Sequence, residues 1–125
     1  MAIDLQRIGA IRIFVRDLAR AREFYAGLLR LPERLDGEEF SAFRLSGVDI
    51  VIEVATDDQA EMVGRFTGFS FAVPDIDAAL SELRDAGVDI TGAAEKQGWG
   101  GILAHIADPD GNELTLVQYP VEGSA

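Results

Sequence analysis

The feature of this sequence that most constrains its fold is a short pattern that occurs twice. Residues 11–18 (IRIFVRDL) and residues 69–76 (FSFAVPDI) each alternate apolar side chains before a Val-x-Asp-apolar junction. Apolar residues at three- and four-residue intervals follow each copy, which predicts a strand followed by a helix, with Asp17 and Asp75 as the helix N-caps. A repeat of this kind in 125 residues predicts two copies of one supersecondary unit that share a sheet or core.

Composition limits the class of protein. With 48% hydrophobic residues, residues 1–125 are expected to form one compact domain with a real core. We expect a soluble, cytoplasmic protein, because no apolar run approaches the roughly 20 residues of a membrane span and no signal peptide is present. The absence of cysteine excludes disulfides, thiolate metal sites and cysteine nucleophiles. The net charge of −11 disfavours nucleic acid and anionic membranes as partners, and it either favours cationic or metal-bearing ligands or serves solubility.

Alternation and turn signals predict the remaining elements. In the first half we expect a strand over 8–15, a helix over 17–29, a charged loop over 33–39, and a hairpin of strands over 40–45 and 48–54. A polar connection over 55–64 leads to the second half. There we expect a strand over 68–73, a helix over 75–86 ended by Gly87, a short strand over 88–90, and strands over 102–107 and 113–118. Each half therefore contains a strand, a helix and two or three further strands.

The ordered combination of these elements resembles the vicinal oxygen chelate superfamily, which includes glyoxalase I, the bleomycin resistance proteins and the extradiol dioxygenases. The resemblance lies in the paired modules, their Val-x-Asp-apolar junctions, the Phe24-Tyr25 pair, and residues 108–117 (DPDGNELTLV). It implies an α+β fold in which two tandem βαβββ modules, at about residues 8–55 and 66–119, form an incomplete barrel with a ligand cavity. Many relatives are homodimers, so a homodimer is expected.

Strand periodicity predicts which side chains face that cavity. In the first strand the odd-numbered apolar residues are expected to pack beneath the helices, so Arg12 and Phe14 face the cavity. The same parity places Ser70 and Thr115 on the cavity side. In the strand that carries Glu53 both faces are largely apolar, so Glu53 lies either in the cavity or near solvent at the strand end.

The resemblance also implies four metal-ligand positions, which fall on Ala10, Glu53, Gly68 and Thr115. Of these residues only Glu53 supplies a carboxylate, and a Thr hydroxyl is a weak substitute for an anionic oxygen. We therefore expect no metal and no cofactor, with Glu53 as the residual position of the site. The glyoxalase and dioxygenase mechanisms need a metal ion to polarise vicinal oxygens. Without that ion neither mechanism is expected here.

Two side chains are the strongest polar candidates. Arg12 interrupts an apolar strand, so we expect it to pair with Glu53 or Glu113, as an ion pair that replaces the metal, or to bind an anionic ligand. His105, the single histidine, is out of phase with its apolar neighbours and either faces the cavity or only forms a hydrogen bond within the sheet. Because histidine titrates near neutrality, His105 is the candidate catalytic residue or ligand anchor.

Aromatic residues form a third group of candidates. Trp99 lies between glycines, and the bleomycin resistance proteins carry a similar Trp-Gly segment at this distance from their Asp-Pro-Asp-Gly turn. This position suits stacking on a flat or cationic ligand, while the alternatives are that Trp99 caps the barrel mouth or lies in a dimer interface. Phe40, Phe43 and Phe66 either extend the apolar wall or belong to the core.

The sequence therefore predicts a metal-free superfamily member that binds or sequesters a small molecule. The ligand-binding candidates are Arg12, Phe14, Glu53, Ser70, Trp99, His105 and Thr115. The second hypothesis is an enzyme: either a lyase, isomerase or dioxygenase that acts on a small oxygenated substrate and keeps a metal through Glu53 and His105, or a metal-free catalyst that uses His105. A third is a structural or regulatory module that acts through its dimer surface. The charge of the ligand stays open, because the acidic composition favours a cation whereas Arg12 argues against a purely anionic pocket.

Overall fold

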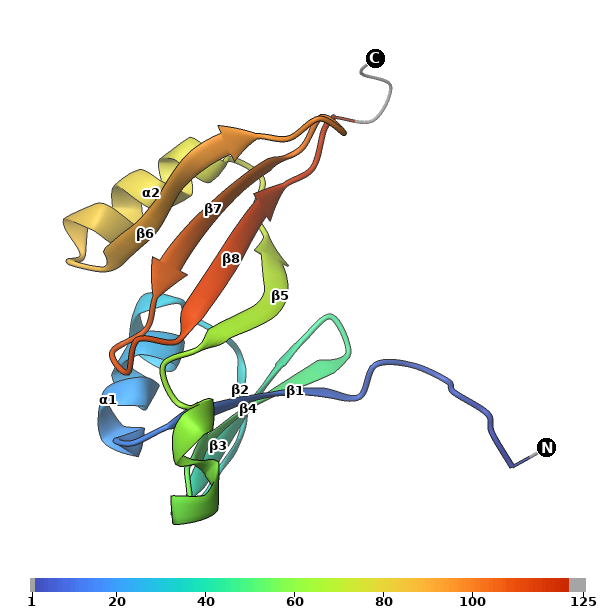
Figure 1. Cartoon of the computed structure of the whole chain (residues 1–125), viewed down its shortest axis with the longest axis vertical. Coiled ribbons are helices and arrows are strands. Elements are labelled where there is room, and N and C mark those ends of the chain that lie inside the picture. The colour runs from blue at the N-terminus through green and yellow to red at the C-terminus, as the bar shows by residue number, and fades with distance from the viewer. Residues whose placement is uncertain (1, 122–125) are drawn as a thin grey trace. The chain divides into compact units, whose positions relative to one another are not determined.

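The computed structural model describes residues 2–121, whose strands form two four-stranded sheets (Figure 1). Contacts divide the chain into residues 1–60 and residues 61–125, called module one and module two below. In each module one strand pair is parallel and the others are antiparallel, and the sheet remains open with two edge strands. The predicted α+β fold of two βαβββ modules is confirmed.

Module one begins with a strand and a helix, as the repeat predicts. Its elements are β1 (Ala10–Val15), α1 (Leu18–Arg22), η1 (Glu23–Leu28), β2 (Glu33–Asp36), β3 (Phe40–Leu45) and β4 (Val48–Val54). The sheet order is β1-β4-β3-β2, with β1 parallel to β4. Asp17 caps α1, since its carboxylate accepts a hydrogen bond from the Arg20 amide at 3.2 Å. The single helix expected over 17–29 is instead a short α-helix that continues as the π-helix η1.

The core of module one lies on the face of its sheet that the helical segment covers. Ile13 pairs in register with Ile52, and both are almost fully buried. Phe24 and Tyr25 contribute from η1, where their rings meet edge to face at 4.9 Å. Phe43 is also fully buried, and so it belongs to the core and not to a ligand wall.

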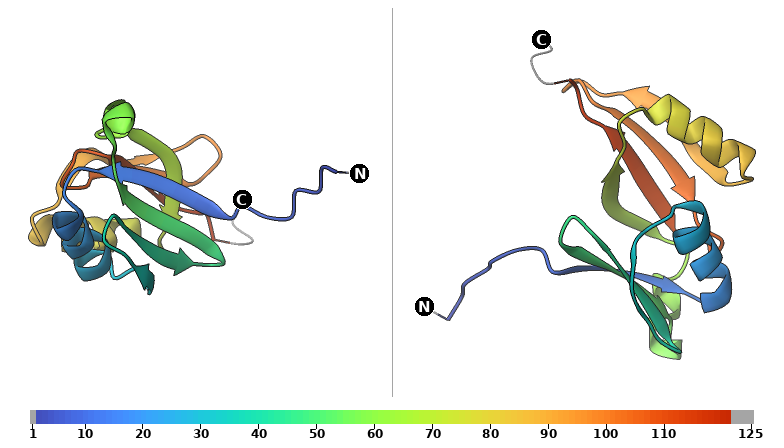
Figure 2. Two further views of the ribbon diagram at one scale, coloured as in Figure 1. Left: turned by 90° about the horizontal axis from the view of Figure 1, so that it is seen from below. Right: turned by 180° about the vertical axis from the view of Figure 1, so that it is seen from behind.

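Module two repeats the arrangement with a longer helix. Its elements are β5 (Phe66–Ala72), α2 (Ile76–Asp85), β6 (Asp89–Lys96), β7 (Ile102–Ala107) and β8 (Glu113–Gln118). The sheet order is β5-β8-β7-β6, and α2 packs along one face of β6, β7 and β8 (Figure 2). Asp75 caps α2 by accepting a hydrogen bond from the Ala78 amide, and Gly87 ends it with a φ of 85°.

The predicted extents of two connections and one strand are wrong. The loop expected over 33–39 contains β2, an edge strand whose four residues are all exposed, so no apolar alternation reveals it. The short strand expected over 88–90 extends to Lys96 as β6, because backbone pairing with β7 continues through two irregularities. The connection expected over 55–64 contains the 3₁₀-helix η2 (Asp57–Met62).

The Asp-Pro-Asp-Gly segment is a turn, as predicted. The Asp108 carboxylate accepts hydrogen bonds from the amides of Asp110 and Asn112, and the Asn112 side chain in turn accepts one from the Gly64 amide. These bonds fix the approach to β8. Among residues 2–121, no helix is long and apolar enough to cross a membrane.

Candidate functional site

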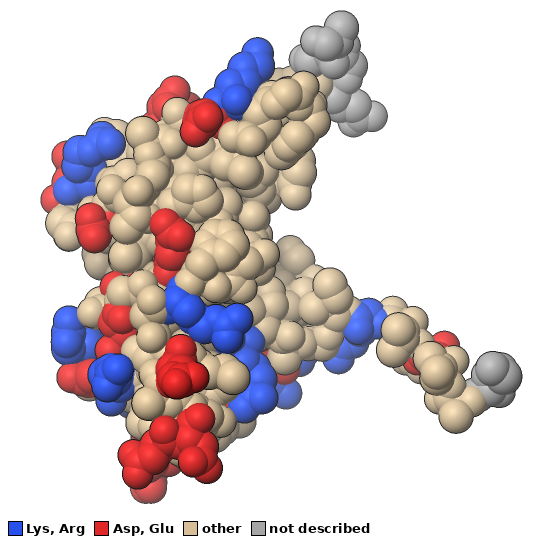
Figure 3. Space-filling view, in the orientation of Figure 1, with Lys and Arg blue, Asp and Glu red and all other residues tan. Residues whose placement is uncertain are grey.

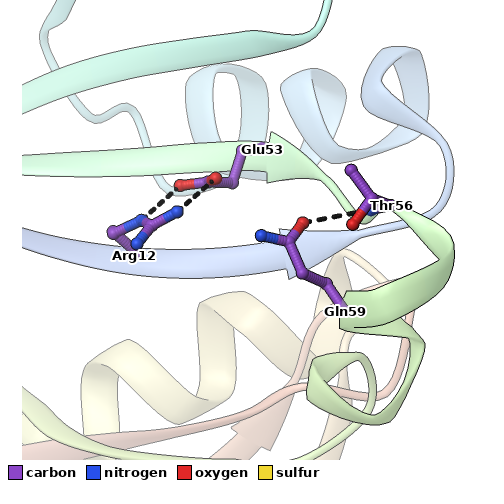
Figure 4. Close-up of polar contacts among 4 residues, drawn as sticks. All are labelled: Arg12, Glu53, Thr56 and Gln59. Atoms are coloured by element: carbon purple, nitrogen blue, oxygen red, sulfur yellow. Dashed lines mark hydrogen bonds and ion pairs between the residues drawn. The ribbon is translucent and has the colours of Figure 1, made fainter.

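The face of the module one sheet opposite α1 carries three of the predicted site residues. Phe14 on β1 lies directly opposite Glu53 on β4, and Arg12 lies two residues earlier on the same face. This placement follows the predicted parity of the first strand. The Glu53 side chain lies beside Arg12 on this face (Figure 4).

Arg12 and Glu53 form a bidentate ion pair. Arg12 Nε donates to Glu53 Oε2 at 2.7 Å, and Arg12 Nη2 donates to Oε1 at 2.8 Å (Figure 4). The hydrogen bond and the negative charge of Glu53 raise the pKa of Arg12 above its ordinary value, so the guanidinium stays charged. The guanidinium carbon also lies 5.2 Å from the centroid of the Phe14 ring. Of the two carboxylates predicted as partners of Arg12, Glu53 and Glu113, the structure shows the pairing with Glu53.

The surroundings of this ion pair are more open than the sequence predicts. The Arg12 side chain is 57% exposed and that of Glu53 is 19% exposed, so Arg12 is not a buried charge. Beyond the end of β4, just before η2, the Thr56 amide donates a hydrogen bond to the Gln59 side chain at 3.0 Å (Figure 4). Arg12 therefore keeps guanidinium N–H groups that Glu53 does not use, and these groups face solvent.

The residues at the four family metal positions do not suit a divalent ion. Ala10 and Gly68 have no donor atom, both oxygens of Glu53 accept hydrogen bonds from Arg12, and the Thr115 hydroxyl is paired with His105. Within residues 2–121, no group of three or more His, Cys, Asp or Glu side chains is gathered as metal sites require.

In module two, a row of residues crosses the sheet on the face opposite α2. His105 on β7 is in register with Thr115 on β8, which is in register with Ser70 on β5. His105 Nδ1 lies 3.0 Å from Thr115 Oγ1, and Thr115 is buried. On its other side His105 is in register with Gly92 on β6. Three predicted site residues of module two are therefore neighbours.

A groove of about 460 Å³ runs beside this row, within module two. Its volume lies in the range of small-molecule sites. The residues that line it come from β6, β7 and the segment that joins them: Gly92, Ala93, Ala94, Glu95, Gln97, Leu103 and His105. His105 was predicted from the sequence as a site residue, whereas the β6 residues were not. The sequence signal that could have indicated these residues is the run of small residues at 92–94, in a segment with no apolar alternation.

Trp99 does not line this groove. Its indole is 56% exposed, lies over the backbone of Gly101, and is 6.0 Å from the ring of Tyr119. Phe66, which is 54% exposed, lies closer to the row, with its ring 6.1 Å from that of His105. Phe66 is thus the aromatic side chain in contact with a predicted site residue of module two.

Comparisons with known proteins agree on the family. The model of the Glyoxalase/Bleomycin resistance protein/Dioxygenase superfamily matches residues 7–116. A superfamily member from Sphaerobacter thermophilus DSM 20745 has 27% identity and a TM-score of 0.78, over 92% of this chain and 98% of that one. No curated protein matches the chain.

Two further solved structures share the fold. The lactoylglutathione lyase from Agrobacterium tumefaciens is 17% identical, with a TM-score of 0.77 over 98% of this chain and 100% of that one. A glyoxalase-related enzyme from Fulvimarina pelagi is 21% identical, with a TM-score of 0.74 over 94% of this chain and 91% of that one. At these identities the likeness concerns the fold alone.

Proposed function

The chain belongs to the glyoxalase/bleomycin resistance protein/dioxygenase superfamily, and we propose that it binds a small organic molecule without a metal ion. The observation that carries this proposal is the bidentate pairing of Glu53 with Arg12. Glu53 is the one carboxylate at the family metal positions, and both of its oxygens are engaged. A divalent ion at Glu53 would also have to lie beside a guanidinium that stays charged, and the two cations would repel each other.

The binding residues are proposed separately for the two modules. In module one they are Arg12, Phe14 and Glu53, which present a cation, a ring and a carboxylate on one sheet face. In module two they are Ser70, His105 and Thr115, together with Trp99 on the loop between β6 and β7. Such sets combine apolar surface with a few polar groups, as small-molecule sites do. We also propose that the protein is a cytoplasmic homodimer.

Metal content is the direct test of this proposal. Purified protein is analysed by plasma mass spectrometry before and after incubation with nickel, manganese, iron and zinc, followed by desalting. The expected result is no stoichiometric metal in either sample. A stoichiometric, tightly held ion would overturn the metal-free proposal and favour a metal-dependent lyase, isomerase or dioxygenase.

A matched pair of variants tests whether the Arg12–Glu53 pair takes part in binding. Arg12→Met removes this pair, and Arg44→Met removes a second exposed pair, in which Arg44 Nε donates to Asp49 at 2.8 Å. Each variant is screened by thermal shift against a panel of small organic molecules, beside the unchanged protein. Compounds that stabilise the unchanged protein and Arg44→Met, but not Arg12→Met, would support the module one site. Equal stabilisation of all three proteins would exclude a role for Arg12 in ligand binding.

A further inference from the structure

Two ring atoms of the His105 imidazole lie close to the neighbouring strands. Nδ1 lies 3.0 Å from Thr115 Oγ1 on the neighbouring strand β8. On the opposite strand, β6, Gly92 packs so closely that a Cβ atom there would lie 2.7 Å from His105 Cδ2. The ring therefore lies between β8 and β6, and the His105 side chain lines the groove.

The contact with the Thr115 hydroxyl favours one of the two neutral tautomers of His105. Thr115 is 3% exposed, and among residues 2–121 the hydroxyl has His105 Nδ1 as its one hydrogen-bond partner. Buried hydroxyl hydrogens generally find acceptors, which favours donation from the hydroxyl to Nδ1. Neutral imidazole has one donor nitrogen and one acceptor nitrogen. Nδ1 is then the acceptor, and Nε2 carries the hydrogen. Nε2 has no hydrogen-bond partner among the same residues.

We propose that the groove of module two is a binding site for an uncharged molecule with an acceptor oxygen, such as an amide or ketone, and that His105 Nε2–H donates to that oxygen. Thr115 is a positioning residue, because it fixes the tautomer and the ring orientation of His105. The proposal rests on the proposed small-molecule function and names its ligand class. An anion is disfavoured since Glu95 is the one charged residue among those that line the groove.

The tautomer is tested first, by nitrogen NMR of the imidazole. His105 is the single histidine, so its ring signals are unambiguous. The expected spectrum of the neutral ring shows an unprotonated Nδ1 and a protonated Nε2. In Thr115→Val the tautomer ratio shifts toward Nδ1–H, and Thr115→Ser, which keeps a hydroxyl, restores the original spectrum. Thr67→Val is the matched control, because the Thr67 hydroxyl donates to the Glu113 carbonyl on the same sheet.

The ligand class is tested with three probes that share one ring: benzamide, benzoate and benzamidine. Titrations are followed through the His105 ring signals and the amide signals of the β6 residues that line the groove. Of the three probes, benzamide is expected to bind most tightly. The Thr115→Val substitution is expected to lower the affinity for benzamide roughly fivefold, which corresponds to the loss of about one hydrogen bond. Because Glu95→Gln removes the negative charge that repels benzoate, this variant is expected to reduce the difference in affinity between benzamide and benzoate.

Three results would overturn this inference. They are an Nδ1–H tautomer in the unchanged protein, equal spectra of Thr115→Val and Thr67→Val, and absence of benzamide-dependent shifts at the groove. Tighter binding of benzamidine would instead assign the groove to cations through Glu95 and reject the donor role of His105. None of these results depends on metal content. Failure here is thus distinguishable from failure of the metal-free proposal.

Discussion

At the scale of single residues, Asp49 links the fold to pH. Its carboxylate accepts a hydrogen bond from Arg44 at 2.8 Å, and Arg34 lies 3.7 Å away. The hydrogen bond from Arg44, with the charges of nearby arginines, lowers the pKa of Asp49 in the folded protein. A carboxylate with a lowered folded pKa stabilises the fold fully above its unfolded pKa of about 3.9, and this contribution is lost as pH falls through the folded value.

We therefore predict that Asp49→Asn lowers the free energy of unfolding near neutral pH and that its difference from the unchanged protein shrinks on acidification. Urea unfolding at a series of pH values, from about pH 6 downward through the carboxylate range, measures this difference. Asp89→Asn, which removes an exposed carboxylate at the start of β6, serves as the control. A difference that stays constant with pH would contradict the role given to the charge of Asp49.

Gly92 gives a second prediction at this scale. Alanine at this position brings a Cβ atom to 2.7 Å from Cδ2 of His105, so the ring must move. We expect Gly92→Ala to destabilise module two by about 1–3 kcal/mol, as overpacking does, and to disturb the hydrogen bond between His105 and Thr115. Denaturant unfolding and the His105 ring signals measure the two effects.

The matched control for this change is Gly98→Ala. No atom lies within 4 Å of a Cβ atom at Gly98, and its backbone does not require a positive φ. Gly98→Ala is expected to leave both the unfolding free energy and the His105 signals within error of the unchanged protein. If both alanine variants behave alike, Gly92 has no special contact with His105.

At the scale of elements, helix α2 depends on its N-cap. The Asp75 side chain accepts a hydrogen bond from the Ala78 amide at 3.1 Å. Asp75→Ala removes this bond and is expected to cost about 1 kcal/mol of unfolding free energy. Asp85→Ala makes the same change at the C-terminal end of α2, where a carboxylate opposes the helix dipole, and should cost nothing or stabilise slightly. Urea unfolding of both variants tests the prediction, and equal losses would refute it.

Most strands could be predicted from the sequence, and the two strands that were missed or cut short, β2 and β6, differ in the physical reason for the error. β7 and β8 alternate because one face packs beneath α2, so their bounds were predicted correctly. β2 is an exposed edge strand held by backbone pairing to β3, which leaves no apolar pattern to read. β6 is interrupted on both sides of Gly92, and these interruptions hide its true length.

The candidate site shows the same division. The parity of β1 predicted that Arg12 and Phe14 share a sheet face, because side-chain direction in a strand alternates strictly, but it left Glu53 and Glu113 as alternative partners of Arg12. The contact between His105 and Thr115 was not predicted. It depends on the register of β7 against β8, which a turn of several residues leaves undetermined in the sequence. The groove beside His105 was missed for the further reason that its small residues carry no chemistry of their own.

At the scale of the whole molecule, the dominant quantity is the net charge of −11. A charge of this size opposes folding through self-repulsion, and dissolved salt screens that repulsion. Acidic side chains gather at one end of the face seen in Figure 3, over η2, where Asp57, Asp58 and Glu61 are all exposed. Repulsion among these three carboxylates is therefore part of the total.

We predict that added sodium chloride raises the free energy of unfolding measured in urea, and that this gain is smaller in the triple variant Asp57→Asn/Asp58→Asn/Glu61→Gln. The variant removes three negative charges, which changes the net charge from −11 to −8. The charge-preserving triple variant Asp57→Glu/Asp58→Glu/Glu61→Asp controls for changes in η2 itself and should respond to salt like the unchanged protein. Because screening acts on charge and not on side-chain shape, an equal salt response in all three proteins would show that the acidic surface over η2 contributes nothing to the stability of the fold.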